Sequence, residues 1–142
     1  MNESLQSSQL KTIHVSAAVI LRTSSNGEKQ IFATQRGYGE WKDWWEFPGG
    51  KIEEGETAEN AIIREIKEEL NTSIKPLQHL CTVEYTYSKF HLVMECFLCT
   101  IESGSLTLLE HENATWLTKS NLTSVKWLPA DKEVFRYIED IL

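Results

Sequence analysis

The apolar positions of the chain recur first in short strand-like runs and later with the longer period of a helix. Residues 12–22 are rich in β-branched and small apolar side chains, and a Ser-Ser-Asn-Gly turn separates them from a shorter run at residues 30–34. This pattern predicts a β-hairpin. Further extended segments are predicted at residues 45–47, 77–88, 91–101 and 115–117.

Two helices complete the predicted order of elements. Thr57 is a suitable N-cap for a helix that contains no Gly or Pro before it ends at Leu70 or Asn71. An amphipathic helix is predicted from about Asp131 to Leu142. The order β, β, α, β, β, β, α indicates a single α/β domain in which helices cover a mixed sheet.

Composition supports one domain, because 142 residues with 41% apolar content and five Trp can build one core. Residues 1–11 are polar and are expected to form a flexible N-terminal segment, which leaves residues 12–142 as the domain. The polar segment lacks the apolar run of a signal peptide, and no later stretch approaches the ~18 apolar residues of a membrane span. We therefore expect a cytoplasmic protein without a membrane partner.

The charge and the cysteines exclude other classes. A formal net charge of −7 argues against a nucleic-acid partner, although acidic proteins bind polyphosphates through divalent cations. Cys96 and Cys99 form a C-x-x-C pattern that is also found in zinc and redox sites. Residues three apart in a strand point to opposite faces, so we expect these thiols to pack in the core.

Carboxylates gather in the predicted helix. Glu65, Glu68 and Glu69 are spaced by three and four residues, which places them on one helical face. An apolar stripe that would pack on the sheet lies beside them; its members are Ile62, Ile63, Ile66 and Leu70. Such a face is typical either of a divalent-cation site or of a solvated acidic surface, and the helix alone does not decide between them.

The residues around the helix add a pattern with many fixed positions. From Gly50 the chain runs G-K-I-E-E-G-E-T-A-E-N-A-I-I-R-E-I-K-E-E-L-N-T. This segment resembles the Nudix box, G-x5-E-x7-R-E-U-x-E-E-x-G-U with U aliphatic, and every charged position matches. Asn71 replaces the second Gly and Thr72 the last aliphatic residue. Asn tolerates a left-handed backbone. Ile74 is expected to supply the apolar anchor that the pattern has at the position of Thr72.

The likeness extends beyond the box, since residues 31–36, 45–51 and 128–131 resemble stretches of MutT-type and CTP-pyrophosphohydrolase-type Nudix enzymes. It implies a Nudix-type α/β/α sandwich with a central mixed β-sheet. It also implies a hydrolase that splits a nucleoside triphosphate into a monophosphate and pyrophosphate. The implied cofactor is Mg²⁺, with Mn²⁺ as an alternative. The implied metal ligands are Glu65, Glu68, Glu69 and the carbonyl of Gly49.

The resemblance also implies the remaining roles. Arg64 would orient the carboxylates, and Glu56 would support the loop before the helix. The general base is either Glu65 or Glu110, the latter in a later loop. We interpret His111, by itself, as a surface residue. The implied substrate-binding residues are Arg36, Glu46, Phe47, Lys51 and Asp131.

Asp131 suggests which base is bound. In MutT-type enzymes the position after Pro-Ala contacts the base edge, and an ionised carboxylate accepts from the exocyclic amine of cytosine but faces O6 of guanine unfavourably. We therefore predict a preference for CTP, dCTP or 5-methyl-dCTP. A protonated Asp131 would instead donate to O6, and an Asp there is also suited to capping the final helix. The alternatives are an 8-oxo-dGTP-sanitising MutT-type hydrolase and an inactive nucleotide-binding module. The oligomeric state, monomer or homodimer, is open.

Overall fold

The computed structural model describes residues 10–109 and 111–142. Its centre is strand β1 (Lys11–Thr23), which pairs in parallel with β6 (Phe90–Ser103). Strand β6 pairs antiparallel with β5 (Ser73–Thr86), and β1 pairs antiparallel with the short β4 (Gly49–Lys51) on its other side. The sheet therefore combines parallel and antiparallel pairs, as the sequence predicted.

The C-terminal end of β1 continues into a second group of strands. It forms the predicted hairpin with β2 (Lys29–Gln35), through a turn in which Gly27 has a positive φ of 85°. Strand β2 then pairs with β3 (Trp45–Glu46) and with β7 (Asn113–Leu117). Strand β1 therefore belongs to both groups. Its earlier residues pair with β4 and β6, and its last residues pair with β2.

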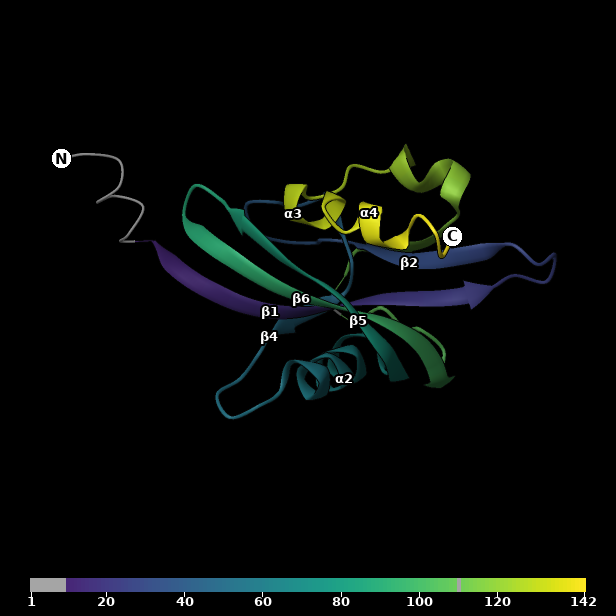
Figure 1. Ribbon diagram of the computed structural model, residues 1–142, viewed down its shortest axis with the longest axis horizontal. Helices are drawn as coiled ribbons and strands as arrows, with labels where there is room; N and C mark the ends of the chain where they lie inside the picture. The colour runs from purple at the N-terminus through teal and green to yellow at the C-terminus, as the bar shows by residue number, and fades with distance from the viewer. Residues whose placement is uncertain (1–9, 110) are drawn as a thin grey trace.

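Helices lie on both sides of this sheet (Figure 1). Helix α2 (Ala58–Leu70) covers one face, and the short helices α3 (Pro129–Lys132) and α4 (Phe135–Ile138) lie over the other, near the 3-10 segment η1 (Lys119–Ser124). The predicted α/β/α sandwich is confirmed. Its layers place the start of α2 beside β4, at one edge of the sheet.

Helix α2 begins and ends as its sequence predicts. The hydroxyl of Thr57 accepts a hydrogen bond from the Asn60 amide at 3.1 Å, which is an N-cap. Asn71 ends the helix in the left-handed conformation with φ of 50°, and its N–H donates to the carbonyl of Lys67. Ile74 is buried in the cluster beneath the helix, so it does supply the apolar anchor.

Two apolar clusters hold the layers together. Three members of the α2 stripe, Ile62, Ile66 and Leu70, are fully buried against the sheet, whereas Ile63 is exposed, contrary to the prediction. Cys99 belongs to this cluster, and Cys96 belongs to the cluster on the α3 and α4 side. The two thiols therefore point to opposite faces and pack in the core, as predicted.

Several elements differ in their bounds from the sequence prediction. Strand β5 begins at Ser73 rather than residue 77 and accommodates Pro76 by irregular pairing. The final helix is split, because the bonds between its two parts are of the tighter i to i−3 kind, such as Val134 N–H to Asp131 carbonyl. Strand β1 already includes Lys11, and the rest of the predicted flexible segment lies outside the described residues, apart from Leu10.

None of the helices within the described ranges is both long enough and apolar enough to cross a membrane.

Candidate active site

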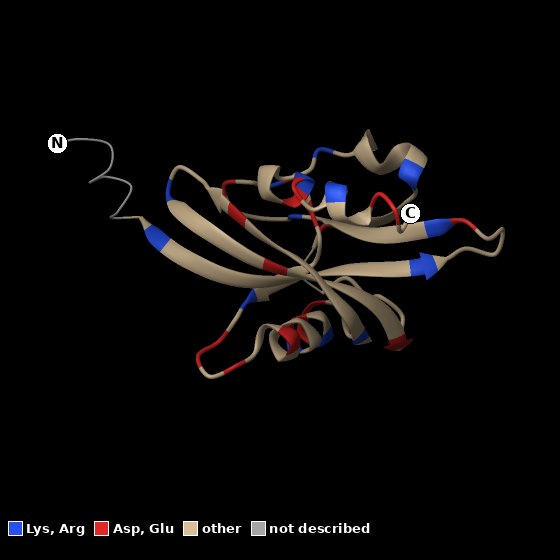
Figure 2. Ribbon diagram, in the orientation of Figure 1, with Lys and Arg blue, Asp and Glu red and all other residues tan. Residues whose placement is uncertain are grey.

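Acidic residues gather on α2 and on the loop between β4 and α2 (Figure 2). Glu65 and Glu69 point toward the sheet edge: the Glu65 side chain is 14% exposed and Glu69 is buried. Glu68 differs, because its side chain is 59% exposed and pairs with Arg64. The three carboxylates predicted to share a helical face thus divide into two that are enclosed and one that borders solvent.

Arg64 connects the helix to the loop that precedes it. Its guanidinium donates two hydrogen bonds to the carboxylate of Glu56, from Nε at 2.8 Å and from Nη2 at 2.9 Å. Its other partners are Glu53 (3.0 Å), Glu65 (3.0 Å), Glu68 (3.3 Å) and the Lys51 carbonyl (3.0 Å). Since only 26% of the side chain is exposed, Arg64 fixes the carboxylate of Glu65 from one side.

The Arg64 pair changes the ionisation of its main partner. The hydrogen bonds from Arg64 lower the pKa of Glu56 to about 2, and a backbone hydrogen bond from Glu53 adds to this effect. The same contacts raise the pKa of Arg64. Both groups are therefore charged at neutral pH, as a structural support for the loop and helix requires.

Two adjacent glycines bring the β4 backbone close to other groups. A Cβ on Gly49 would lie 2.0 Å from the carbonyl oxygen of Ser16 on β1. A Cβ on Gly50 would lie 2.4 Å from the carboxyl carbon of Glu65. Only glycine allows this approach, so the backbone of β4 forms one wall against which the Glu65 carboxylate lies.

A pocket of about 530 Å³ opens between β4, α2 and the loop that follows β2. Its polar wall consists of Arg36, Glu46, Gly49, Gly50, Lys51, Glu65, Glu69 and His111. Carboxylates, cations and exposed backbone together are suited to polyphosphate and its counter-ions. The volume is sufficient for a chain of phosphates.

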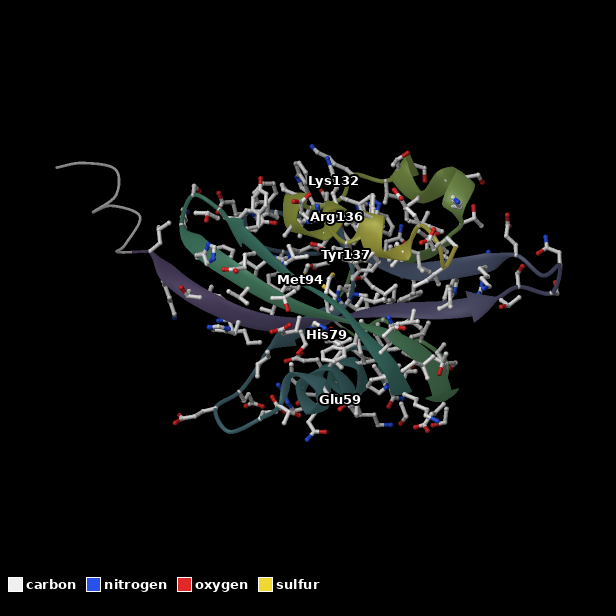
Figure 3. The ribbon with its side chains drawn as sticks, in the orientation of Figure 1. Glu59, His79, Met94, Lys132, Arg136 and Tyr137 are labelled. Carbon is white, nitrogen blue, oxygen red and sulfur yellow. The ribbon has the colours of Figure 1, made fainter. Side chains whose placement is uncertain are left out.

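A smaller pocket of about 110 Å³ adjoins the first one and shares Arg36, Glu46, Gly49 and Gly50 with it. Its other walls are mostly apolar and aromatic and include Trp41, Phe47, Tyr87, Phe90 and Met94. Met94 lies on the side of β6 that faces α3 and α4 (Figure 3). A flat, weakly polar group fits such a wall better than a charged one does.

A carboxyl group is buried in the smaller pocket. Asp131 is 4% exposed, and its Oδ2 accepts a hydrogen bond from the Phe47 amide at 2.9 Å. Burial raises the pKa of Asp131 well above its usual range; nearby Glu46 raises it further, whereas the Phe47 amide and Arg36 oppose the shift. The capping interpretation is wrong, since α3 has its N-cap at Leu128 and no side-chain cap.

Comparison with known proteins decides the family of this chain. A family model of the NUDIX domain matches residues 12–138, which is most of the sequence. The chain belongs to the Nudix hydrolase family.

Individual relatives agree with this assignment. An 8-oxo-dGTP diphosphatase of Proteus vulgaris is 35% identical over 98 residues, which cover 68% of this chain and 84% of that protein. A CTP pyrophosphohydrolase of Escherichia coli is 26% identical and covers 86% and 87% of the two chains. A crystal structure of a MutT NUDIX hydrolase from Burkholderia pseudomallei shares the fold, with a TM-score of 0.80, 24% identity, and coverage of 90% and 98%.

Nudix hydrolases use divalent metal ions, and the donors around the larger pocket fit such an ion. Glu65, Glu69 and the backbone of Gly49 line one wall, and Mg²⁺ typically binds one or two carboxylates together with substrate phosphates. Glu68 is not among the residues lining this pocket, and no three His, Cys, Asp or Glu side chains in the described ranges are grouped as metal ligands. The ligand set of Glu65, Glu68, Glu69 and Gly49 stays a prediction.

The substrate-binding residues predicted from the sequence lie together in this Nudix hydrolase. Arg36 and Glu46 form a two-pronged ion pair, with distances of 2.8 and 3.1 Å, at the boundary of the two pockets. Lys51 lines the larger pocket, whereas Phe47 and Asp131 line the smaller one. Their proximity agrees with a shared role, and their contacts with substrate stay a prediction.

The sequence interpretation missed several residues of the pocket walls. His111 was expected on the surface but lines the larger pocket beside Glu65 and Glu69. Of the three neighbouring tryptophans Trp41, Trp44 and Trp45, it is Trp41 that lines the smaller pocket. Glu110, the predicted alternative general base, lies outside the described residues. No local signal identifies His111 or Trp41 as a pocket residue, because each comes from a loop that long-range contacts bring to its pocket.

The two glycines of β4 should respond differently to an added methyl group. In Gly49→Ala the new Cβ meets backbone atoms of β1, so we expect a loss of roughly 3 kcal/mol in unfolding free energy. In Gly50→Ala it meets the Glu65 side chain, which can move, so we expect at least a ~10-fold loss of kcat with a smaller loss of stability. Melting curves and metal-dependent hydrolysis of both variants test this. Wild-type turnover in Gly50→Ala would contradict the role given to Glu65.

Proposed function

We propose that this Nudix hydrolase converts a nucleoside triphosphate and water into a nucleoside monophosphate and pyrophosphate, with Mg²⁺ or alternatively Mn²⁺ as cofactor. The observation that carries the proposal is the junction of two pockets of different chemistry. The larger pocket is lined by enclosed carboxylates and by cations, and the smaller one is aromatic with one buried carboxyl group. A nucleotide offers this combination of a polyphosphate and a flat base.

Different residues of the chain bind the phosphates and the cation. Arg36 and Lys51 line the phosphate pocket, and their positive charges would bind and orient the phosphate oxygens. Glu65 and Glu69 would hold the cation, which supplies positive charge beside the phosphates and the attacking water. Arg64 fixes Glu65 by a 3.0 Å hydrogen bond. Attack of the water on the α-phosphorus expels pyrophosphate, whereas attack on the β-phosphorus expels the nucleoside monophosphate. In both cases the anhydride bond between these two phosphorus atoms breaks, and the products are the same.

The proton of the attacking water needs an acceptor. Glu65 and Glu110 stay the two candidates for this base. The amide of Leu109 donates to the Glu69 carbonyl at 3.1 Å, and the amide of Glu112 donates to the Gln35 carbonyl at 3.2 Å. These bonds tie the residues on both sides of position 110 to helix α2 and strand β2. They support a role for this loop in the reaction, and activity measurements on Glu110→Gln would assign it.

Base preference depends on the protonation state of Asp131. An ionised carboxylate accepts from the N4 amine of cytosine, which supports the predicted preference for CTP, dCTP or 5-methyl-dCTP. A protonated carboxyl donates to O6 of a guanine base, and the raised pKa of buried Asp131 favours this form. 8-oxo-dGTP is therefore the second candidate substrate, and the Proteus vulgaris relative is named for its action on that nucleotide.

The decisive experiment measures kcat/KM for CTP and 8-oxo-dGTP as a function of pH, over the range in which the enzyme stays folded. If Asp131 contacts the base, the CTP to 8-oxo-dGTP ratio rises with pH, because deprotonation turns a donor into an acceptor. Asp131→Asn should remove this pH dependence, and Asp131→Ala should abolish most of the discrimination. A ratio that is the same in the wild type and in Asp131→Ala would show that Asp131 does not select the base.

A wider panel tests the reaction class itself. It contains 8-oxo-dGTP, dGTP, CTP, dCTP, 5-methyl-dCTP and ADP-ribose, each with Mg²⁺ and with Mn²⁺. Pyrophosphate release from one or more of the triphosphates, abolished by EDTA, is the expected result. If no compound of the panel, ADP-ribose included, is hydrolysed in a metal-dependent way, the chain is an inactive nucleotide-binding module instead. A cytoplasmic location and the absence of a nucleic-acid partner stay predictions.

A further inference from the structure

The hydroxyl of Tyr87 is the hydrogen-bond acceptor for a backbone amide next to Asp131. The Ala130 amide donates to it at 3.0 Å, and this bond is buried, with Ala130 completely inaccessible to solvent. Ala130 is the residue before Asp131 in the first turn of α3. Tyr87 thus ties the end of β5 to the backbone that carries the carboxyl group of the smaller pocket.

The ring of Tyr87 is held by its neighbours. It stacks on Phe90 with centroids 5.2 Å apart and meets the edge of Trp41 at 5.5 Å. The hairpin itself is closed by a 2.8 Å hydrogen bond from the Tyr87 amide to the Phe90 carbonyl. A ring fixed on several sides places its hydroxyl at a defined position, so the Ala130 amide has a defined acceptor.

Asp131 is consequently held at two points by different parts of the chain. Its carboxylate is held by the Phe47 amide, beside β3, at 2.9 Å, and its backbone is held through Ala130 by Tyr87. Burial raises the pKa of Tyr87 to about 12, so the phenol keeps its proton at neutral pH. Loss of the hydroxyl would leave the Ala130 amide buried without this acceptor, which favours movement of the turn.

We propose that Tyr87 is a positioning residue for base selection, which it controls by fixing the turn of α3 that carries Asp131. This inference rests on the proposed role of Asp131 in contacting the base. Discrimination between bases depends on placing a hydrogen-bonding group within a fraction of an ångström. Tyr87 therefore affects which nucleotide is hydrolysed more strongly than it affects the hydrolysis of phosphate bonds as such.

The test compares Tyr87→Phe, which keeps the ring and removes the hydroxyl, with Tyr85→Phe as the matched control. The ring centroids of Tyr85 and Tyr87 are 4.7 Å apart, but Tyr85 does not line the smaller pocket. The Tyr87→Phe change is expected to shift the kcat/KM ratio of CTP to 8-oxo-dGTP by roughly 3- to 10-fold, the size of one hydrogen bond. The Tyr85→Phe ratio should equal that of the wild type.

A double-mutant cycle separates positioning from direct contact with the base. In the Asp131→Ala background, Tyr87→Phe should leave the nucleotide ratio unchanged, because no carboxyl group remains to be positioned. The same shift in both backgrounds, or no shift in Tyr87→Phe alone, would overturn the proposal. If Asp131→Ala alone changes nothing, it is the proposed base contact of Asp131 that fails.

A measurement without turnover tests the contact itself. Amide hydrogen exchange of Ala130, followed by NMR, should be faster in Tyr87→Phe than in the wild type and in Tyr85→Phe, since the acceptor has been removed. Unchanged exchange at Ala130 would show that Tyr87 does not hold the turn. This result is obtained whether or not either nucleotide is a substrate.

Discussion

Replacing Glu65 or Glu69 with Gln is expected to lower kcat by at least ~100-fold, because stabilisation of charge on the phosphates is the largest catalytic contribution in such reactions. Both carboxylates line the larger pocket, and neither is freely solvated. The amide keeps the shape of the side chain but removes its negative charge. Steady-state kinetics at saturating Mg²⁺ on the preferred nucleotide, with metal titrations, measure the effect.

Glu59→Gln is the matched control for these two variants. Glu59 lies in the first turn of the same helix and is exposed to solvent (Figure 3). Its replacement removes the same charge from α2 and should leave turnover unchanged. Melting temperatures of all three variants should stay close to the wild type, since removing one of several crowded charges relieves repulsion. Near-normal turnover in Glu65→Gln and Glu69→Gln would refute the metal-site assignment.

The α2 region was predictable because its determinants are local. The cap at Thr57 and the left-handed Asn71 depend on residues close in sequence, and both are as predicted. The buried stripe follows from helical period, although that period alone did not show that Ile63 lies beyond the edge of the sheet. Spacing also placed Glu65 and Glu69 correctly. Spacing did not show that Glu68 stays exposed, with its side chain paired to Arg64 one helical turn earlier.

The smaller pocket was less predictable because its walls come from distant segments. Trp41 follows β2, Tyr87 follows β5 and Asp131 lies in α3, so the pocket forms only when segments far apart in the sequence meet in the fold. The motif around Asp131 indicated a base contact, yet its shifted pKa depends on burial and on Glu46, Phe47 and Arg36, which are far from it in the sequence. Similarly, His111 reaches the larger pocket because its loop is anchored to α2 by backbone bonds from Thr107 and Leu109.

Arg64→Ala is expected to reduce activity and stability together, unlike the changes at Glu65 and Glu69. The guanidinium joins the loop to α2 through hydrogen bonds to the Glu56 carboxylate and the Lys51 carbonyl. Their loss should lower the unfolding free energy by about 2 kcal/mol, since hydrogen bonds to charged groups are among the stronger ones. Release of Glu65 should lower kcat by at least ~10-fold. Lys67→Ala, at an exposed position of the same helix, is the control.

The pH dependence of stability is a second test of the role of Arg64. The pKa of Glu56 is lowered to about 2 by Arg64, so this pair contributes stability that is present above the ordinary carboxyl pKa of about 4.5 and is lost as pH falls toward 2. The difference in unfolding free energy between wild type and Arg64→Ala should shrink over this interval. Arg64→Lys should recover only part of it, because an ammonium group cannot replace the two-pronged contact with Glu56. Full activity and an unchanged melting temperature in Arg64→Ala would show that Arg64 holds neither the loop nor Glu65.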